Sequence, residues 1–152
     1  MPPDMDRTAR CSLAAVYLRV ALGIAFLSAI ADRFGWWGAP GTDHVAWGNF
    51  ARFTAYAGRL NPWAPMSLVP AIAWIATAVE IALGILLVVG LFTRTVAWLS
   101  GSLLLLFAFG MIAGSGIKTS LDASVFTASA GAFVLACQPS FPWSIDALVH
   151  QP

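Results

Sequence analysis

Four long apolar stretches constrain the fold of this chain more than any other feature. They run over about residues 13–31, 68–91, 95–113 and 120–137. Each has about the length that an α-helix needs to cross the roughly 30 Å hydrocarbon core of a membrane. A helix is the expected state, because an open strand in lipid would leave backbone groups without hydrogen bonds. We therefore predict an all-α fold, an integral membrane bundle of four transmembrane helices in one domain over residues 1–152.

The composition supports this prediction and excludes two classes of protein. Hydrophobic residues make up 59% of the chain and charged residues only 10%, whereas a soluble domain carries about 25% charged residues. The expected partner of the surface is therefore the lipid bilayer, which excludes an ordinary cytosolic enzyme. The net charge of +1 creates no basic field, so we expect no nucleic acid as a partner.

The ends of the chain allow two interpretations. Arg7 and Arg10 before an apolar run, with Ala29-Ile30-Ala31 after it, are also the pattern of a cleaved signal peptide. Arg19 interrupts that run, which favours a helix that is retained. Four spans would place both termini on one side, and the arginines beside the helix ends on that side predict that it is cytoplasmic.

The long segment between the first two spans is expected to have structure of its own, because loops of this length are usually functional or folded. Residues 43–58 have a helical pattern, which places apolar side chains on one face and polar side chains on another. The pattern predicts an amphipathic helix that lies in the membrane interface beside the end of the bundle.

Two ionisable residues lie within the apolar spans, Arg19 in the first and Glu80 in the second. Such residues are costly in lipid and normally face the bundle interior with a partner. Their positions along antiparallel helices give similar depths, so we predict a buried ion pair between them. It either fixes the packing of the two helices or forms a catalytic proton site. Gly23 and Gly84, each four residues further on, indicate that these helices approach closely.

A second polar group is expected on the side of the long segment. A spacing of four residues favours an ion pair between Lys118 and Asp122 on a helix. The group is either a set of ordinary solvated helix ends or a shallow substrate pocket for an anion or a lipid headgroup. Its members are Asp32, Arg33, Arg52, Arg59, Lys118 and Asp122.

The remaining candidates for chemistry are isolated in the sequence. His44 and His150 belong to no ligand-like cluster, so no metal site is predicted. Cys11 and Cys137 end two spans on the same predicted side, but they form no Cys-x-x-Cys motif.

Four sequence segments together resemble the DoxX family. They are LRVALGIAFL, ADRFG, ATAVEIALGILLVVGLFTR and GIKTSLDASVFTASAGAFVLA, and they span about residues 13–137. The most specific positions are Glu80 with Gly84, the segment from Gly90 to Arg94, and Arg19 with Gly23. This family includes the small membrane subunit of thiosulfate:quinone oxidoreductase. The resemblance implies a multi-pass protein of the bacterial inner membrane that is associated with sulfur-compound oxidation, thiol redox chemistry or quinones.

Three functions remain open on these grounds. The first is a small inner-membrane subunit of a quinone-linked redox system, an oxidoreductase in which Glu80 handles protons and Arg19 tunes it. Quinone is then the possible cofactor. The sequence shows no redox centre, so either a partner protein that carries thiol or metal centres supplies the electrons, or the substrate reacts with quinone directly. A protein partner or a homo-oligomer is the expected assembly. The second function is a non-enzymatic membrane scaffold or assembly factor, and the third is a small-solute transporter.

Overall fold

The computed structural model describes residues 3–149, with side chains from Arg10 onward, and its elements within that range are all helices. The all-α class is therefore confirmed. The longer helices are α1 (Pro3–Arg33), α2 (Phe50–Leu60), α3 (Val69–Val89), α4 (Thr93–Ser115) and α6 (Val125–Ala136). Two short helices complete the fold, α5 (Ile117–Asp122) and α7 (Ile145–Val149).

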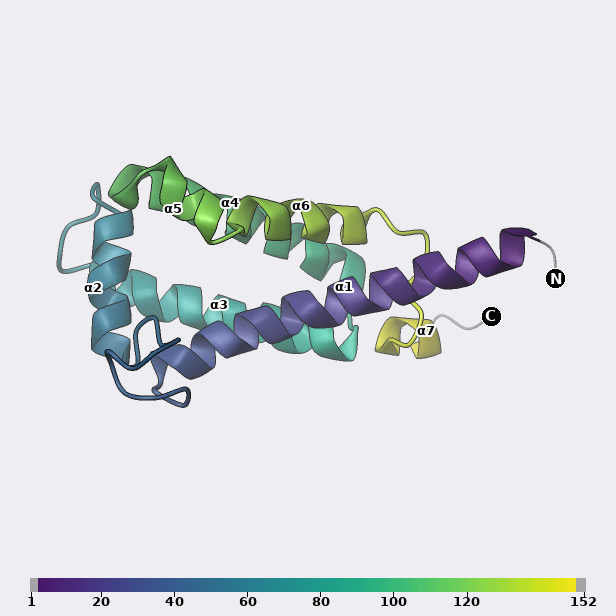
Figure 1. The fold of residues 1–152 in the computed structure, drawn as a ribbon, viewed down its shortest axis with the longest axis horizontal. Coiled ribbons are helices and arrows are strands. Elements are labelled where there is room, and N and C mark those ends of the chain that lie inside the picture. Colours follow the sequence, from purple (N-terminus) through teal and green to yellow (C-terminus); the bar gives the residue numbers. More distant parts are fainter. Residues whose placement is uncertain (1–2, 150–152) are drawn as a thin grey trace.

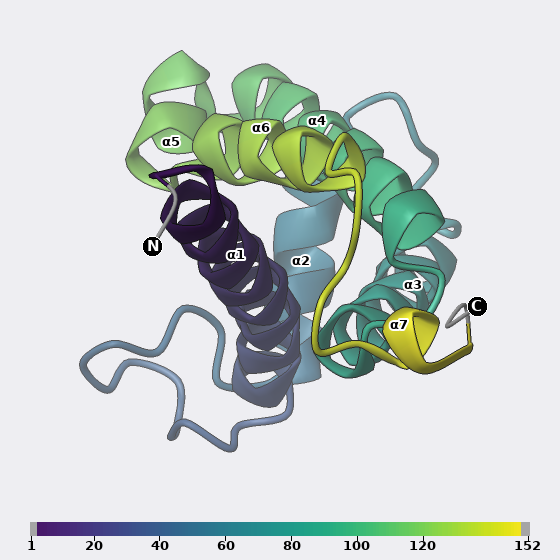
Figure 2. The ribbon, with the colours of Figure 1, turned by 90° about the vertical axis from the view of Figure 1, so that its right-hand side faces the viewer.

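The long helices form a bundle of two antiparallel pairs (Figure 1). The most extensive contacts join α1 to α3 and α4 to α6, while contacts of α1 with α6 and of α3 with α4 close the bundle. Figure 2 views the bundle from one end and shows α2 lying across the opposite end, where it contacts both α3 and α4. The short helix α7 lies at the same end as the start of α1.

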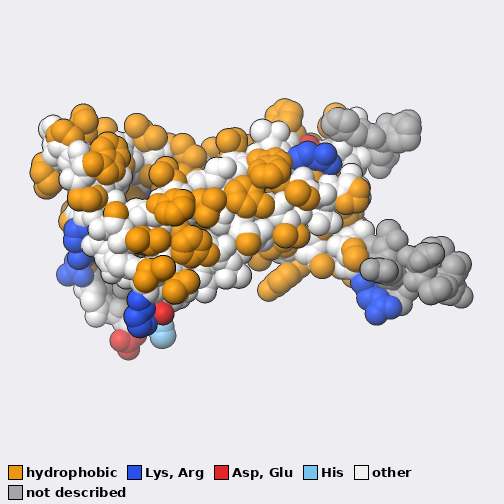
Figure 3. All heavy atoms as spheres, turned by 90° about the horizontal axis from the view of Figure 1, so that it is seen from above, with side chains coloured by type: hydrophobic (Ala, Val, Ile, Leu, Met, Phe, Trp, Pro, Cys, Tyr) orange, Lys and Arg blue, Asp and Glu red, His pale blue; other side chains and the backbone are white. Residues whose placement is uncertain are grey.

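Three helical segments are long and apolar enough to cross a membrane: Arg10–Arg33, Val69–Val89 and Thr93–Ser115. They match the first three predicted spans to within a few residues. Large apolar side chains cover the flank of the bundle, and the charged side chains in this view gather towards its ends (Figure 3). Because such a flank needs an apolar solvent, the chain is an integral membrane protein.

The fourth predicted span, residues 120–137, is not one continuous helix. It is divided into α5 and α6 at Ala123 and Ser124, where Ser124 has a left-handed backbone with φ of 54°. The second piece has 12 residues and a length of about 18 Å, which is shorter than the hydrocarbon core. The predicted count of four transmembrane helices is therefore not confirmed. The break was missed because apolar composition does not show a local change of the backbone.

Small residues let the helices of each pair approach closely. A Cβ atom on Gly23 would lie 2.7 Å from the side chain of Val88 and 2.9 Å from the carbonyl oxygen of Gly84, which confirms the predicted close approach of α1 and α3. In the other pair, the Ser129 hydroxyl donates to the Gly101 carbonyl at 2.8 Å, and a Cβ on Gly101 would lie 2.6 Å from the Phe133 ring. Such contacts replace the hydrophobic effect as the attraction between helices in lipid.

The helix predicted over residues 43–58 begins later and is shorter. Asn49 caps α2, since its side chain accepts a hydrogen bond from the backbone N–H of Arg52 at 2.9 Å. The preceding residues form an irregular loop, in which Gly48 has φ of 67° and packs against the backbone of Pro40. Phe53 of α2 faces the bundle and is buried, whereas the adjacent Arg52 is exposed.

Candidate functional site

A buried ion pair joins the last residue of α1 to the middle of α3. Nη2 of Arg33 lies 2.7 Å from both carboxylate oxygens of Glu80, and Nη1 donates to the Thr77 hydroxyl at 2.9 Å. The side chains of Arg33 and Glu80 are only 4% and 2% exposed. Each charge therefore has its counter-charge inside the bundle, and the guanidinium has a further hydrogen bond to Thr77.

The direction of helical side chains explains how Arg33 reaches the interior. Side chains of an α-helix lean towards its N-terminus, so an arginine in the last turn points back into the bundle. Leu22, Phe26, Ile30 and Arg33 are all buried at spacings of three and four residues. Arg33 thus continues the buried stripe of α1, although it is the final residue of the helix.

The predicted ion pair between Arg19 and Glu80 is not formed, and that prediction was wrong. Arg19 donates instead to the carbonyl oxygens of Leu87 at 2.9 Å, Val88 at 3.1 Å and Trp143 at 2.6 Å. The last carbonyls of a helix have no partner within the helix. Arg19 supplies donors to the end of α3, while the carboxylate of Glu80 is already occupied by Arg33.

The surroundings of Arg19 form a compact joint at the end of the bundle that holds α7. Gly90 follows α3 with φ of 71°, and a Cβ there would lie 2.2 Å from Nη1 of Arg19. The Asp146 carboxylate accepts the backbone N–H groups of Phe92 and Thr93 at 2.8 and 2.7 Å, and so caps the start of α4. These contacts give Arg19 a structural role at this end, away from the Arg33–Glu80 pair.

Aromatic rings enclose the guanidinium group of Arg33. Its Cζ atom lies 3.7 Å from the centroid of the Phe53 ring and 5.4 Å from that of Trp47, which is within cation–π distance. The Nε atom of Arg33 is buried and has no hydrogen-bond partner within the described residues. One N–H donor of this group is therefore left for a ligand or a water molecule.

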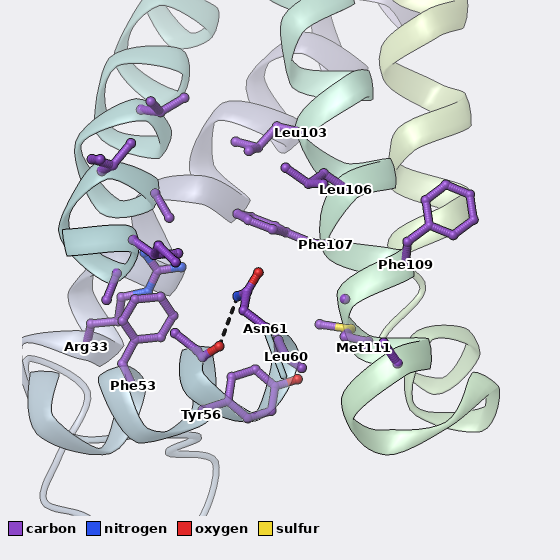
Figure 4. Close-up of a pocket in the computed structure, with 18 of the residues that line it drawn as sticks. Arg33, Phe53, Tyr56, Leu60, Asn61, Leu103, Leu106, Phe107, Phe109 and Met111 are labelled. Atoms are coloured by element: carbon purple, nitrogen blue, oxygen red, sulfur yellow. Dashed lines mark hydrogen bonds between the residues drawn. The ribbon is translucent and has the colours of Figure 1, made fainter. Parts of the chain in front are cut away.

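A cavity of about 540 Å³ lies beside this group, between α2, α3 and α4. Its volume is in the range of small-molecule sites, and its walls are mostly apolar, as such sites require. Figure 4 shows Phe107 reaching in from α4, and the amide oxygen of Asn61 turned into the space while the amide nitrogen donates to Ala57. Arg33 and Tyr56 also line the cavity.

The mouth of the cavity lies on the apolar flank of the bundle. Ile75 and Val79 of α3 and Leu106 and Phe109 of α4 line it, and all four side chains are exposed. In a membrane this flank faces lipid. A hydrophobic molecule can therefore enter sideways from the bilayer without crossing water.

Tyr56 adds a hydroxyl group to the wall formed by α2. Burial raises the pKa of this phenol, and the nearby Arg59 acts in the opposite direction with a smaller effect. The phenol therefore stays protonated at neutral pH and is available as a hydrogen-bond donor.

The six residues of the predicted polar pocket do not form one pocket. Only Arg33 lines the cavity, because Asp32 turns the other way and accepts backbone N–H groups of the loop. The remaining four lie on exposed helix surfaces, where Lys118 and Asp122 form the predicted ion pair with each other. These four are Arg52, Arg59, Lys118 and Asp122.

Sequence reasoning missed the partners of Glu80. Thr77 lies three residues before Glu80, so a helical wheel places both on one face, and this signal was available. The positions of Phe53, Tyr56 and Asn61 depend on where α2 packs, which no local pattern gives.

Comparison with protein families supports the resemblance seen in the sequence. The family model described as DoxX matches residues 14–114. The matched region runs from α1 to the end of α4 and contains the ion pair and every residue that lines the cavity. Neither the curated proteins nor the solved structures gave a match to this chain.

Proposed function

Because the chain belongs to the DoxX family, we propose that it is a small subunit of a quinone-linked redox system in the inner membrane of a bacterium. The cavity beside Arg33 is the proposed quinone site. The observation that carries the proposal is an apolar cavity that opens on the lipid-facing flank and is lined in part by Arg33. The Nε–H of Arg33 is buried and has no partner within the described residues, so a ligand reaches this donor after a small movement of the side chain.

The chemistry of the walls suits a flat ring that bears carbonyl groups. The Nε–H of Arg33 is a donor for one carbonyl oxygen, and the aromatic walls offer surfaces on which a ring stacks. The amide oxygen of Asn61 is an acceptor, which suits the hydroxyl groups present after reduction. Glu80 and Thr77 hold the guanidinium of Arg33 in place, so they act as positioning residues.

The redox balance of this proposal requires a partner. A quinone takes up two electrons and two protons to become a quinol, and the oxidation of two thiols to one disulfide releases the same numbers. The electrons would come from a reduced sulfur compound or thiol that a partner protein presents. The two protons would come from the same thiols. Glu80 holds Arg33 in place and is not a relay, because the guanidinium between Glu80 and the ligand does not release a proton.

Filling the cavity is the direct test. Ala76 of α3 is half-buried and lines the cavity, so Ala76→Phe places a ring inside it. The control is Ala78→Phe on the same helix, because Ala78 is exposed and is not part of the wall. Binding of decylubiquinone to the purified full chain is measured by quenching of tryptophan fluorescence, since Trp47 and Trp63 line the site.

We expect Ala76→Phe to weaken binding by about tenfold or more, because the ring occupies the ligand's volume and one factor of ten is only about 1.4 kcal/mol. Ala78→Phe should bind like the natural chain. Equal affinities of the two variants, or no binding to the natural chain, would contradict the quinone site.

One observation favours the second function, a non-enzymatic membrane scaffold or assembly factor. The Arg33–Glu80 pair ties α1 to α3 and needs no ligand for that role. In that case, disrupting the pair should lower the amount of folded protein, while filling the cavity should have no effect on the partner complex.

A further inference from the structure

We propose a second ligand site, for a primary ammonium group, at Asp32 beneath the loop over residues 34–49. This proposal does not depend on the quinone site. It rests on a separate pocket of about 620 Å³ between the outer face of α1 and that loop. Ala25, Ser28 and Ala29 of α1 form one wall, and residues 43–47 contribute to the other.

Asp32 is the charged group in this pocket that lacks a full set of partners. The residue is only 6% exposed. Oδ2 accepts the backbone N–H groups of Ala46 at 3.1 Å and Trp47 at 3.0 Å. Oδ1 is buried and accepts no hydrogen bond within the described residues. A buried carboxylate oxygen without a donor is unfavourable, so a donor that reaches Oδ1 stabilises the folded chain.

The neighbouring cation cannot serve this carboxylate. The guanidinium of Arg33 is directed into the bundle, where Glu80 and Thr77 hold it. The two adjacent residues of α1 therefore serve opposite sides of the helix end. The sequence pattern grouped them into one pocket for an anion or a lipid headgroup, whereas the structure leaves a separate site with negative charge.

The rest of the pocket suits an organic cation. The indole rings of Trp37 and Trp47 line it, and the faces of such rings attract ammonium groups. Trp37 is fixed in this position, because its Nε1 donates to the carbonyl of Ser28 at 3.1 Å. Asp43 and His44 complete the lining, and Asp43 adds a second negative charge.

The hydrogen-bond requirement selects one kind of ammonium. A primary ammonium has N–H donors for Oδ1, whereas a trimethylammonium group has none. Oδ1 has no exposed surface of its own, so the ligand reaches it only when the loop moves slightly. The loop has no regular secondary structure and contains three glycines and a histidine with positive φ over residues 35–44.

Two sources carry this chemistry, the headgroup of a phosphatidylethanolamine-type lipid and a free primary amine. The pocket lies at the end of a membrane-spanning helix, beside the exposed rings of Trp36 and Trp37. Exposed tryptophans of this kind are typical of the headgroup level of a bilayer. Both sources are therefore tested.

The test uses the purified full chain in detergent micelles, with calorimetric titration of three probes. The probes are dihexanoyl-phosphatidylethanolamine, dihexanoyl-phosphatidylcholine and ethanolamine. We expect the natural chain to bind the ethanolamine lipid at least tenfold more tightly than the choline lipid, the factor that one charge-assisted hydrogen bond provides. If free ethanolamine binds as well as the ethanolamine lipid, a free amine is sufficient; if the ethanolamine lipid binds and free ethanolamine does not, the site requires a lipid headgroup.

The matched variants are Asp32→Asn and Asp122→Asn. An asparagine keeps one oxygen for the N–H groups of Ala46 and Trp47, so the loop stays in place while the charge is lost. Asp32→Asn should weaken the binding of whichever primary-amine probe the natural chain binds, by about tenfold or more. Asp122→Asn changes an exposed carboxylate of α5 and should leave that affinity unchanged. Asp43→Asn, a change at an exposed position, should weaken it about twofold to threefold.

Three results would overturn the proposal. They are equal affinities for the ethanolamine and choline lipids, an unchanged affinity in Asp32→Asn, and no binding of any primary amine to the natural chain. The first and third results are obtained with the natural chain, so they do not depend on whether a variant folds.

Discussion

At the scale of single residues, the position of each arginine along α1 determines which group it binds. Both buried arginines of α1 could be located from the sequence, but their partners could not. A residue at a helix end is normally assigned to solvent, so Arg33 was placed outside the bundle. The tilt of its side chain and the stripe from Leu22 to Arg33 bring it to Glu80 instead. Arg19 donates to carbonyl groups that have no partner within α3, because the helix ends at Val89.

Glu80→Gln tests the ion pair at this scale. The substitution leaves the charge of Arg33 buried and uncompensated, which we expect to destabilise the folded chain by about 3–5 kcal/mol. The double variant Arg33→Met with Glu80→Met removes both charges and should recover most of that loss, yet it should bind no quinone. Thermal unfolding and quinone binding in detergent are the two measurements. If the double variant binds quinone normally, Arg33 has no role in the site.

Gly90→Ala tests the joint around Arg19. The left-handed backbone at this position costs a non-glycine residue about 1–2 kcal/mol, and the clash with Arg19 should add about 1–3 kcal/mol. Gly41→Ala is the matched control, because Gly41 also has positive φ but has no atom within 4 Å of the added Cβ. A Cβ on Gly90 would also lie 2.4 Å from Cβ of Ser144, so equal losses of thermal stability in the two variants would show that Arg19 and Ser144 both move aside freely.

At the scale of elements, apolar runs located three membrane helices well, whereas the break in the fourth span and the start of α2 were missed. A run of about twenty apolar residues fixes where a membrane helix lies, because lipid leaves the backbone no other state. The break at Ser124 and the start of α2 at Asn49 depend on single backbone angles and on one capping side chain. The average periodicity of apolar residues predicts neither the break at Ser124 nor the start at Asn49. The cavity depends on α2 and therefore could not be predicted from the spans alone.

Gly101→Ala tests the contact between α4 and α6. The new methyl group would lie 2.6 Å from the Phe133 ring, so the two helices must separate or the ring must turn. We expect a loss of about 1–3 kcal/mol in the free energy of unfolding, as for other overpacked interiors. Gly110→Ala on the same helix is the control, because its nearest neighbours lie at ordinary contact distances of 3.4 Å and more. The prediction fails if both substitutions are neutral.

At the scale of the whole molecule, the broken pair α5–α6 determines the topology. The pair runs back along α4, and α7 lies at the same end of the bundle as the start of α1, so in a membrane-spanning bundle the exposed thiols of Cys11 and Cys137 lie on one side. We expect a membrane-impermeant maleimide to label both from the same side of oriented vesicles. The variants Cys11→Ser and Cys137→Ser separate the two signals. A cysteine at the exposed position Ser67 should be labelled from the other side.

Because the cavity opens on the lipid-facing flank, the concentration that controls its occupancy is the concentration of the ligand in the bilayer. A ligand that enters between α3 and α4 comes from the bilayer, so its supply is set by its mole fraction among the lipids and not by its molarity in water. Adding empty vesicles or detergent dilutes such a ligand without changing the protein. Apparent dissociation constants given per volume of water should therefore rise in proportion to total lipid, while those given per lipid molecule should stay constant.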